Sequence, residues 1–158
     1  MKTTTSLFAV FFSYPIVMAL GEKLFEESGN VVGFKVTKVH PIEGTTMEVS
    51  FSSELKSFGK FPSGRNIGSG TMTHYPHGVA DGSQQGTFLI GEGEAEQYMY
   101  WSHQKAKLTD GGKWKGLSIA SGFTNSQKFS WMNSLLMVGE AESDPAAQQF
   151  RLTAYEWV

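Results

Sequence analysis

Glu156 and Glu140 are the two carboxylates whose positions in the sequence suggest chemistry. Near the C-terminus, every second residue of one run is apolar, namely Phe150, Leu152 and Ala154. Glu156 continues this spacing and so shares a face with apolar side chains. Burial of a carboxylate is costly unless the group is paired. Burial also raises the pKa of the carboxyl, which is one way to obtain a general acid or base at neutral pH. The alternative is a position at the rim, paired with a lysine or arginine. Glu140 interrupts an apolar run and presents the same choice.

A second group of candidate residues lies in the run 98–103. Tyr98 and Tyr100 alternate with Trp101 and His103, so the two pairs face opposite sides of a strand. Whichever pair faces inward supplies an aromatic wall with a polar group, the usual composition of a small-molecule pocket. On an inward face His103 would be a general base. The alternative is an ordinary structural histidine.

Metal and nucleotide sites receive little support from the sequence. His74 and His77 flank Pro76 in one turn, and with Glu92 or His103 they would supply three metal ligands. Pro76 fixes the loop but does not aim both rings at one point, so we expect no bound metal. The glycines on either side of Glu92 lack the strand-to-helix context of a phosphate-binding loop, so we expect no nucleotide or other cofactor.

The overall composition excludes further classes of function. The chain has 158 residues, with 13 basic and 15 acidic side chains and a formal charge of −2. No basic stretch is present, which argues against nucleic-acid binding. Cysteine is absent, so a disulfide, a thiol nucleophile and a cysteine-metal site are all excluded. Eighteen glycines, with many aromatic and β-branched residues, favour strands and tight turns.

The chain after the first 21 residues is predicted to be a series of short strands. Residues 45–53 alternate strictly between apolar and polar, as in a half-buried strand, and Thr109-Asp110-Gly111-Gly112 is a strong hairpin signal. One helical turn is predicted near 126–132. Ser28-Gly29-Asn30 is interpreted as a turn. The predicted strands cover residues 23–27, 31–40, 45–53, 66–74, 85–94, 97–108, 113–121, 134–141 and 148–157.

Eight or nine consecutive strands of similar length predict an all-β fold that removes its edges by closing on itself. Glycines inside strands, such as Gly68 and Gly116, favour the coiling that a narrow barrel needs. We therefore predict a closed eight-stranded antiparallel β-barrel over residues 22–158. A barrel of this size either fills its interior with side chains or leaves room for one small ligand.

Residues 1–21 form a separate apolar segment. Lys2 precedes an apolar run from Leu7 to Leu20, and small residues stand before the charged Glu22. This is the layout of a secretory signal peptide, and the run is short for a membrane span. We predict a cleaved signal, which would place the domain in the periplasm or outside the cell. The alternatives are an N-terminal strand packed on a cytoplasmic domain and a retained membrane anchor.

Several short motifs resemble a known family. They are Gly93-Glu94, Trp114-Lys115-Gly116, residues 123–128, Gly139-Glu140 and Tyr155-Glu156-Trp157. As a set they resemble the DUF3224 family, small bacterial and archaeal proteins of unknown function, over residues 22–158. Lys115 stands where that family usually has arginine. The resemblance implies an eight-stranded barrel similar to that of allene oxide cyclase, with calycin-like topology, and implies no established activity.

These observations favour a barrel that binds an apolar or aromatic small molecule in its interior. The predicted lining residues are Trp101, His103, Trp114, Phe123, Glu140 and Glu156. A second hypothesis is a cyclase or isomerase that confines a reactive chain in the cavity, with Glu156, Glu140 or His103 as the acid–base group. A third is a structural module without a ligand that forms a homodimer through its outer face, which exposed aromatic residues in one patch would favour.

Overall fold

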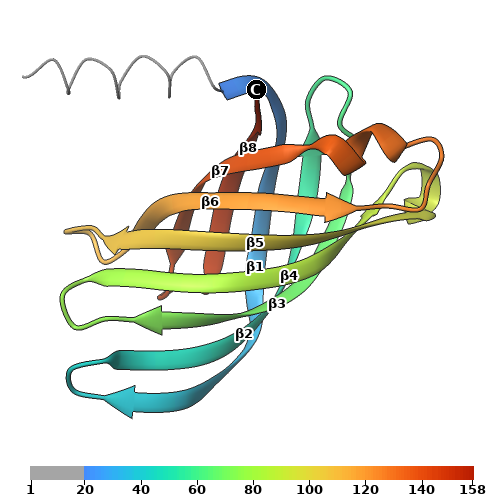
Figure 1. Cartoon of the computed structure of the whole chain (residues 1–158). Coiled ribbons are helices and arrows are strands. Elements are labelled where there is room, and N and C mark those ends of the chain that lie inside the picture. The colour runs from blue at the N-terminus through green and yellow to red at the C-terminus, as the bar shows by residue number, and fades with distance from the viewer. Residues whose placement is uncertain (1–19) are drawn as a thin grey trace, which may run out of the picture.

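The computed structural model describes residues 20–158, which form one closed barrel of eight antiparallel strands, as predicted (Figure 1). Each strand pairs with the next along the chain, and β8 pairs with β1. The predicted leader lies outside the described residues except for Leu20 and Gly21, which begin β1. The strands are β1 (Leu20–His40), β2 (Gly44–Ser57), β3 (Gly64–His74), β4 (Val79–Ile90), β5 (Glu96–Leu108), β6 (Trp114–Phe123), β7 (Leu136–Asp144) and β8 (Gln149–Trp157).

Two short 3-10 turns are the helical elements of residues 20–158. The turn predicted near 126–132 is η2 (Ser130–Ser134), a few residues later than expected. The other, η1 (Glu92–Glu94), replaces the predicted end of the strand 85–94. Gly91 adopts a φ of 81° there, which ends the strand, and Arg65 Nη2 donates a hydrogen bond to Glu94 Oε2 at 2.9 Å. Neither turn is long and apolar enough to span a membrane.

The predicted turn at residues 28–30 is wrong, because β1 runs unbroken through it. Gly29 pairs with Ser53 on β2 and with Phe150 on β8. A Cβ atom at Gly29 would lie 2.3 Å from Ser53 Cβ and 2.4 Å from the Ser52 carbonyl oxygen. This glycine therefore marks a close approach of two strands inside the barrel, rather than the end of a strand. Beyond Asn30, β1 pairs with β2 alone and forms an arm with it.

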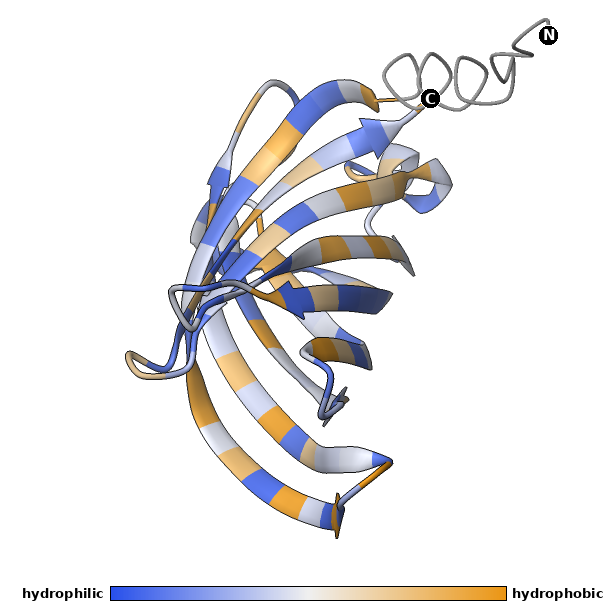
Figure 2. Ribbon diagram, turned by 90° about the vertical axis from the view of Figure 1, so that its left-hand side faces the viewer, coloured by the Kyte–Doolittle hydropathy of each residue, from blue (hydrophilic) through white to orange (hydrophobic). Residues whose placement is uncertain are grey.

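Hydrophobic and hydrophilic residues alternate along the strands (Figure 2). Because successive side chains point to opposite sides of a sheet, the barrel has an inner face and an outer face. On β5, Tyr98 and Tyr100 are buried inside the barrel, whereas Trp101 and His103 are exposed. The interior is therefore lined by the tyrosine pair of this strand. On β4, Phe88 and Ile90 point inward in the same way.

The hydrophobic core fills one end of the barrel. The β2–β3 loop contributes Phe61 and the segment around η2 contributes Phe129 and Met132, which plug this end (Figure 1). Aromatic rings pack edge to face or tilted, with Phe25 and Phe88 at 5.5 Å and Phe88 and Tyr100 at 4.6 Å between centroids. The core consists of Leu24, Phe25, Leu55, Phe61, Phe88, Ile90, Tyr98, Tyr100, Phe129, Met132, Leu135, Met137 and Ala154.

The close approach at Gly29 predicts a difference between two glycines of the same strand. Gly29→Ala forces the new methyl group into the β2 backbone and should lower the free energy of unfolding by about 1–3 kcal/mol. Gly33→Ala meets nothing within 4 Å and should leave stability within about 1 kcal/mol of wild type, or raise it. Urea unfolding of both variants checks this. Equal midpoints for the two variants would contradict the close approach.

Candidate functional site

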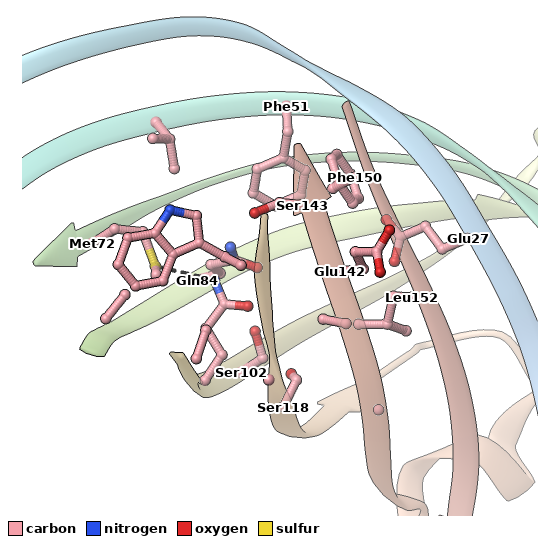
Figure 3. Close-up of a pocket in the computed structure, with 18 of the residues that line it drawn as sticks. Glu27, Phe51, Met72, Gln84, Ser102, Ser118, Glu142, Ser143, Phe150 and Leu152 are labelled. Atoms are coloured by element: carbon pink, nitrogen blue, oxygen red, sulfur yellow. Dashed lines mark hydrogen bonds between the residues drawn. The ribbon is translucent and has the colours of Figure 1, made fainter. Parts of the chain in front are cut away.

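The half of the barrel away from the plug encloses an open cavity of about 490 Å³ (Figure 3). It opens at the end where the β1–β2, β3–β4 and β5–β6 hairpins turn, on the left of Figure 1. Small inward-facing residues leave this space, among them Ser102, Ala106, Gly116, Ser118 and Gly139. Side chains therefore fill the interior at the plugged end and leave it open at the other.

Glu27 forms the polar part of the cavity floor, next to the hydrophobic core. Its side chain is buried, with 6% of the residue exposed. Ser53 Oγ and Asn66 Nδ2 both donate hydrogen bonds to Glu27 Oε1, the latter at 2.7 Å. Asn66 Nδ2 also donates to the Tyr100 hydroxyl oxygen at 2.9 Å. Both donors to Glu27 reach Oε1, and the second carboxyl oxygen accepts no side-chain hydrogen bond from residues 20–158.

Burial changes the acid–base properties of this floor. Loss of hydration raises the pKa of Glu27 above its ordinary value of 4.5, and the hydrogen bonds from Ser53 and Asn66 oppose this rise only in part. Burial also raises the pKa of the Tyr100 hydroxyl, and the nearby Glu27 carboxyl adds to this effect. The floor therefore holds its protons more strongly than exposed groups do, and Glu27 can donate a proton or a hydrogen bond.

The walls of the cavity are mainly apolar. Phe51 and Phe150 pack edge to face at 5.7 Å between ring centroids, on opposite sides of β1. Nearer the mouth, the Trp114 indole stacks on the His74 imidazole at 4.6 Å. Burial lowers the pKa of His74, so this ring is neutral at pH 7. Such a wall suits an apolar or aromatic guest.

Charged residues surround the mouth. Lys113 and Lys115 both contact Glu142, with Nζ–Oε distances of 3.3 Å and 3.1 Å. Hydrogen bonds from the two ammonium groups lower the pKa of Glu142, which is partly exposed to solvent. The rim of the cavity is therefore polar, whereas its wall is mainly apolar.

Of the six predicted binding residues, only Trp114 lines the cavity. Trp101 and Phe123 lie on the outer face with 54% and 41% of their surface exposed. His103, also outside, has its Nε2 atom 3.2 Å from Asp81 Oδ1. The prediction that these three residues lie in the interior is therefore wrong. On β5 and β6 the residues adjacent to them in the sequence point inward instead.

The two predicted carboxylates also lie away from the cavity. Glu140 is exposed on the outer face of β7, because Gly139 takes the inward position. Glu156 keeps the parity of Ala154 but lies half-buried near the end of β8, opposite Met137. Glu27 was missed because a turn was assigned at residues 28–30. In an unbroken strand Glu27 shares the parity of Phe25 and Val31, the same signal that drew attention to Glu156.

The two histidines considered as metal ligands stack on different aromatic rings. His74 stacks on Trp114, whereas His77 stacks on Tyr75 at 5.6 Å. Within residues 20–158, no group of three or more histidine or acidic side chains is placed to hold a metal ion.

The raised pKa of Glu27 gives stability a pH dependence of known sign. Above pH 4.5 the carboxyl ionises in the unfolded chain while the folded protein retains the proton, so the folded state loses stability as the pH rises to the folded pKa. Glu27→Gln is neutral throughout, so its stability relative to wild type should be higher at pH 8 than at pH 4.5. Urea unfolding at both pH values measures this difference.

Glu26→Gln is the matched control. An exposed ion pair with Lys23 lowers the pKa of Glu26, so stability from this pair is present above pH 4.5 and lost as the pH falls. The stability of Glu26→Gln relative to wild type should therefore be slightly lower at pH 8 than at pH 4.5. A pH-independent difference between Glu27→Gln and wild type would contradict the assignment of a protonated carboxyl.

Comparison with known proteins finds solved structures with a similar fold. No protein-family model and no curated protein matches the sequence, so the resemblance to DUF3224 stays a prediction. A protein of unknown function from Clostridium acetobutylicum is 16% identical, with a TM-score of 0.73 over 87% of this chain and 98% of its own. A β-barrel-like protein from Acinetobacter baumannii is also 16% identical, with a TM-score of 0.71 over 87% and 94%. An enzyme from Penicillium herquei is 12% identical, with a TM-score of 0.58 over 85% and 92%. This chain is therefore similar in fold to barrels of unknown function and, more distantly, to one enzyme.

Proposed function

We propose that this protein binds one apolar or aromatic small molecule in the open half of its barrel. The observation that carries the proposal is the cavity of about 490 Å³, which lies within the usual size of ligand sites, about 300–1,000 Å³. Its apolar walls would hold the body of the guest, and burial of that surface would supply most of the binding free energy.

Glu27 would fix the orientation of the guest. A protonated carboxyl donates a hydrogen bond, so the favoured polar group on the guest is an oxygen acceptor such as a carbonyl, ether or hydroxyl. Ser53 and Asn66 hold the carboxyl in place through Oε1. The guest would then lie with its polar end at the floor and its apolar body between Phe51, Phe150 and the Trp114 indole.

A second candidate function is isomerisation or cyclisation of the bound molecule. The favouring observation is a buried carboxyl of raised pKa at the floor of a mainly apolar cavity, which is suited to proton donation. Glu27 would take the acid–base role predicted for Glu156, Glu140 or His103. The walls would hold a flexible guest in a reactive shape.

Binding can be tested with N-phenyl-1-naphthylamine, an uncharged aromatic probe whose fluorescence rises in apolar surroundings. We expect saturable binding to one site per chain. Gln84→Trp places a large ring in the cavity and should weaken binding at least tenfold, because Gln84 lines it (Figure 3). Gln85→Trp, the next residue on β4, adds the same ring to the outer face and should leave affinity within about twofold of wild type. Equal losses in both variants would refute binding in the interior.

The catalytic alternative needs an identified guest. Native mass spectrometry of protein purified from its own source gives the mass of any retained molecule. Incubation of that molecule with wild-type protein should yield a product of the same mass and a different chromatographic retention time. Glu27→Gln should abolish this conversion while it keeps probe affinity within about threefold. Unchanged turnover by Glu27→Gln would remove Glu27 from the acid–base role.

A further inference from the structure

The outer face of the barrel carries an apolar patch, of which Leu117 alone also borders the cavity. The patch spans three neighbouring strands, and its members are 39–57% exposed. Register makes it continuous: Met99 lies beside Phe123, and Ser121 lies between Trp101 and Leu136. We call it the β6 patch, and it consists of Met99, Trp101, Leu117, Ile119, Phe123 and Leu136. Proteins that act as monomers rarely expose apolar patches of this kind, so a covering partner is expected.

Charges on the two sides of the β6 patch have opposite signs. On β5 the outward residues beyond Trp101 and His103 are Lys105 and Lys107. On β7 the outward residues at the same levels are Glu140 and Glu142. Lys105, Leu117 and Glu140 form one row across the three strands.

The row of Lys105, Leu117 and Glu140 is complementary to itself. A two-fold axis parallel to β6 places the β5 side of one copy over the β7 side of another at the same level along the strands. Lys105 of each copy then faces the partner's Glu140, and Leu117 and Ile119 meet their own equivalents near the axis. Glu140 makes no ion pair within residues 20–158. Lys105 makes one ion pair there, with Asp81, whose Oδ2 atom lies 3.9 Å from the Lys105 Nζ atom.

We propose that the β6 patch is the interface of a symmetric dimer, and that its occupant is a second copy of this chain. The two sheets pack face to face, as in sandwich proteins, with apolar contacts at the centre and Lys105–Glu140 pairs at both ends. A different partner protein would not need both charges on this face at matching levels on either side of β6. The cavity mouths open at the hairpin end of each barrel, where Lys105 and Leu117 of the interface also border the cavity.

Charge reversal tests both the interface and its axis. Sedimentation velocity of the full chain should show a mass twice 17.4 kDa. Lys105→Glu and Glu140→Lys each place like charges opposite one another and should raise the dimer dissociation constant at least about tenfold. The double variant restores opposite charges across the axis and should return the constant to within about threefold of wild type.

Two further variants separate this interface from non-specific association. Ile119→Glu places a charge at the centre of the patch and should give a monomer. Ile42→Glu changes a more exposed apolar residue on the distant β1–β2 hairpin, 81% exposed, and should leave the dimer intact. Thermal unfolding confirms that each variant is folded. A monomeric wild type at 200 µM, or a double variant no better than either single one, would overturn the proposal, whereas probe binding by that monomer would leave the proposed function standing.

Discussion

The distribution of side-chain volume along the barrel interior is the constraint on which the rest of this structure depends. An eight-stranded barrel has an interior just wide enough for side chains to fill. One end is filled by phenylalanine, tyrosine and methionine side chains, which come from the strands and from the two covering loops. Glycine, alanine and serine occupy most of the inward positions of β5, β6 and β7 toward the other end. The same closed set of hydrogen-bonded strands therefore surrounds a packed core at one end of the barrel axis and an open cavity at the other.

Glu27 lies where these two halves meet, and this position explains its hydrogen bonds. A carboxyl placed among Phe25, Phe88 and Tyr100 would be costly without partners. Ser53 and Asn66 reduce that cost, and a retained proton reduces it further. Asn66 Oδ1 is buried and finds no partner among residues 20–158, so the network is not fully satisfied. A buried polar network that is only partly satisfied is costly to stability, which makes its position at the floor of a cavity informative about function.

The fold was predictable from sequence, whereas most of the site was not. Alternation, turn residues and strand count led to the closed barrel, because these signals are local. Which face of β5 points inward depends on how the sheet closes, and the run 98–103 carries aromatic residues on both faces. Trp101 and Phe123 are large apolar residues that lie outside, so the expectation that aromatic residues point inward failed for them. Gly29 was interpreted as a turn because a glycine between a serine and an asparagine is the usual signal for one, although here it allows two strands to approach closely.

Strand alternation also explains how one short sequence can carry two surfaces that change independently. On β5 the inward residues Tyr100 and Ser102 face the cavity, while Trp101 and His103 between them face outward. A substitution at an inward position alters the volume and polarity of the cavity and leaves the outer face intact, since adjacent side chains point to opposite sides of the sheet. The exposed aromatic residues Trp101 and Phe123 therefore belong to the outer face and do not line the cavity. Large exposed apolar residues also lie on β1 and β3, among them Val32, Val36 and Ile67, whereas β2 exposes none.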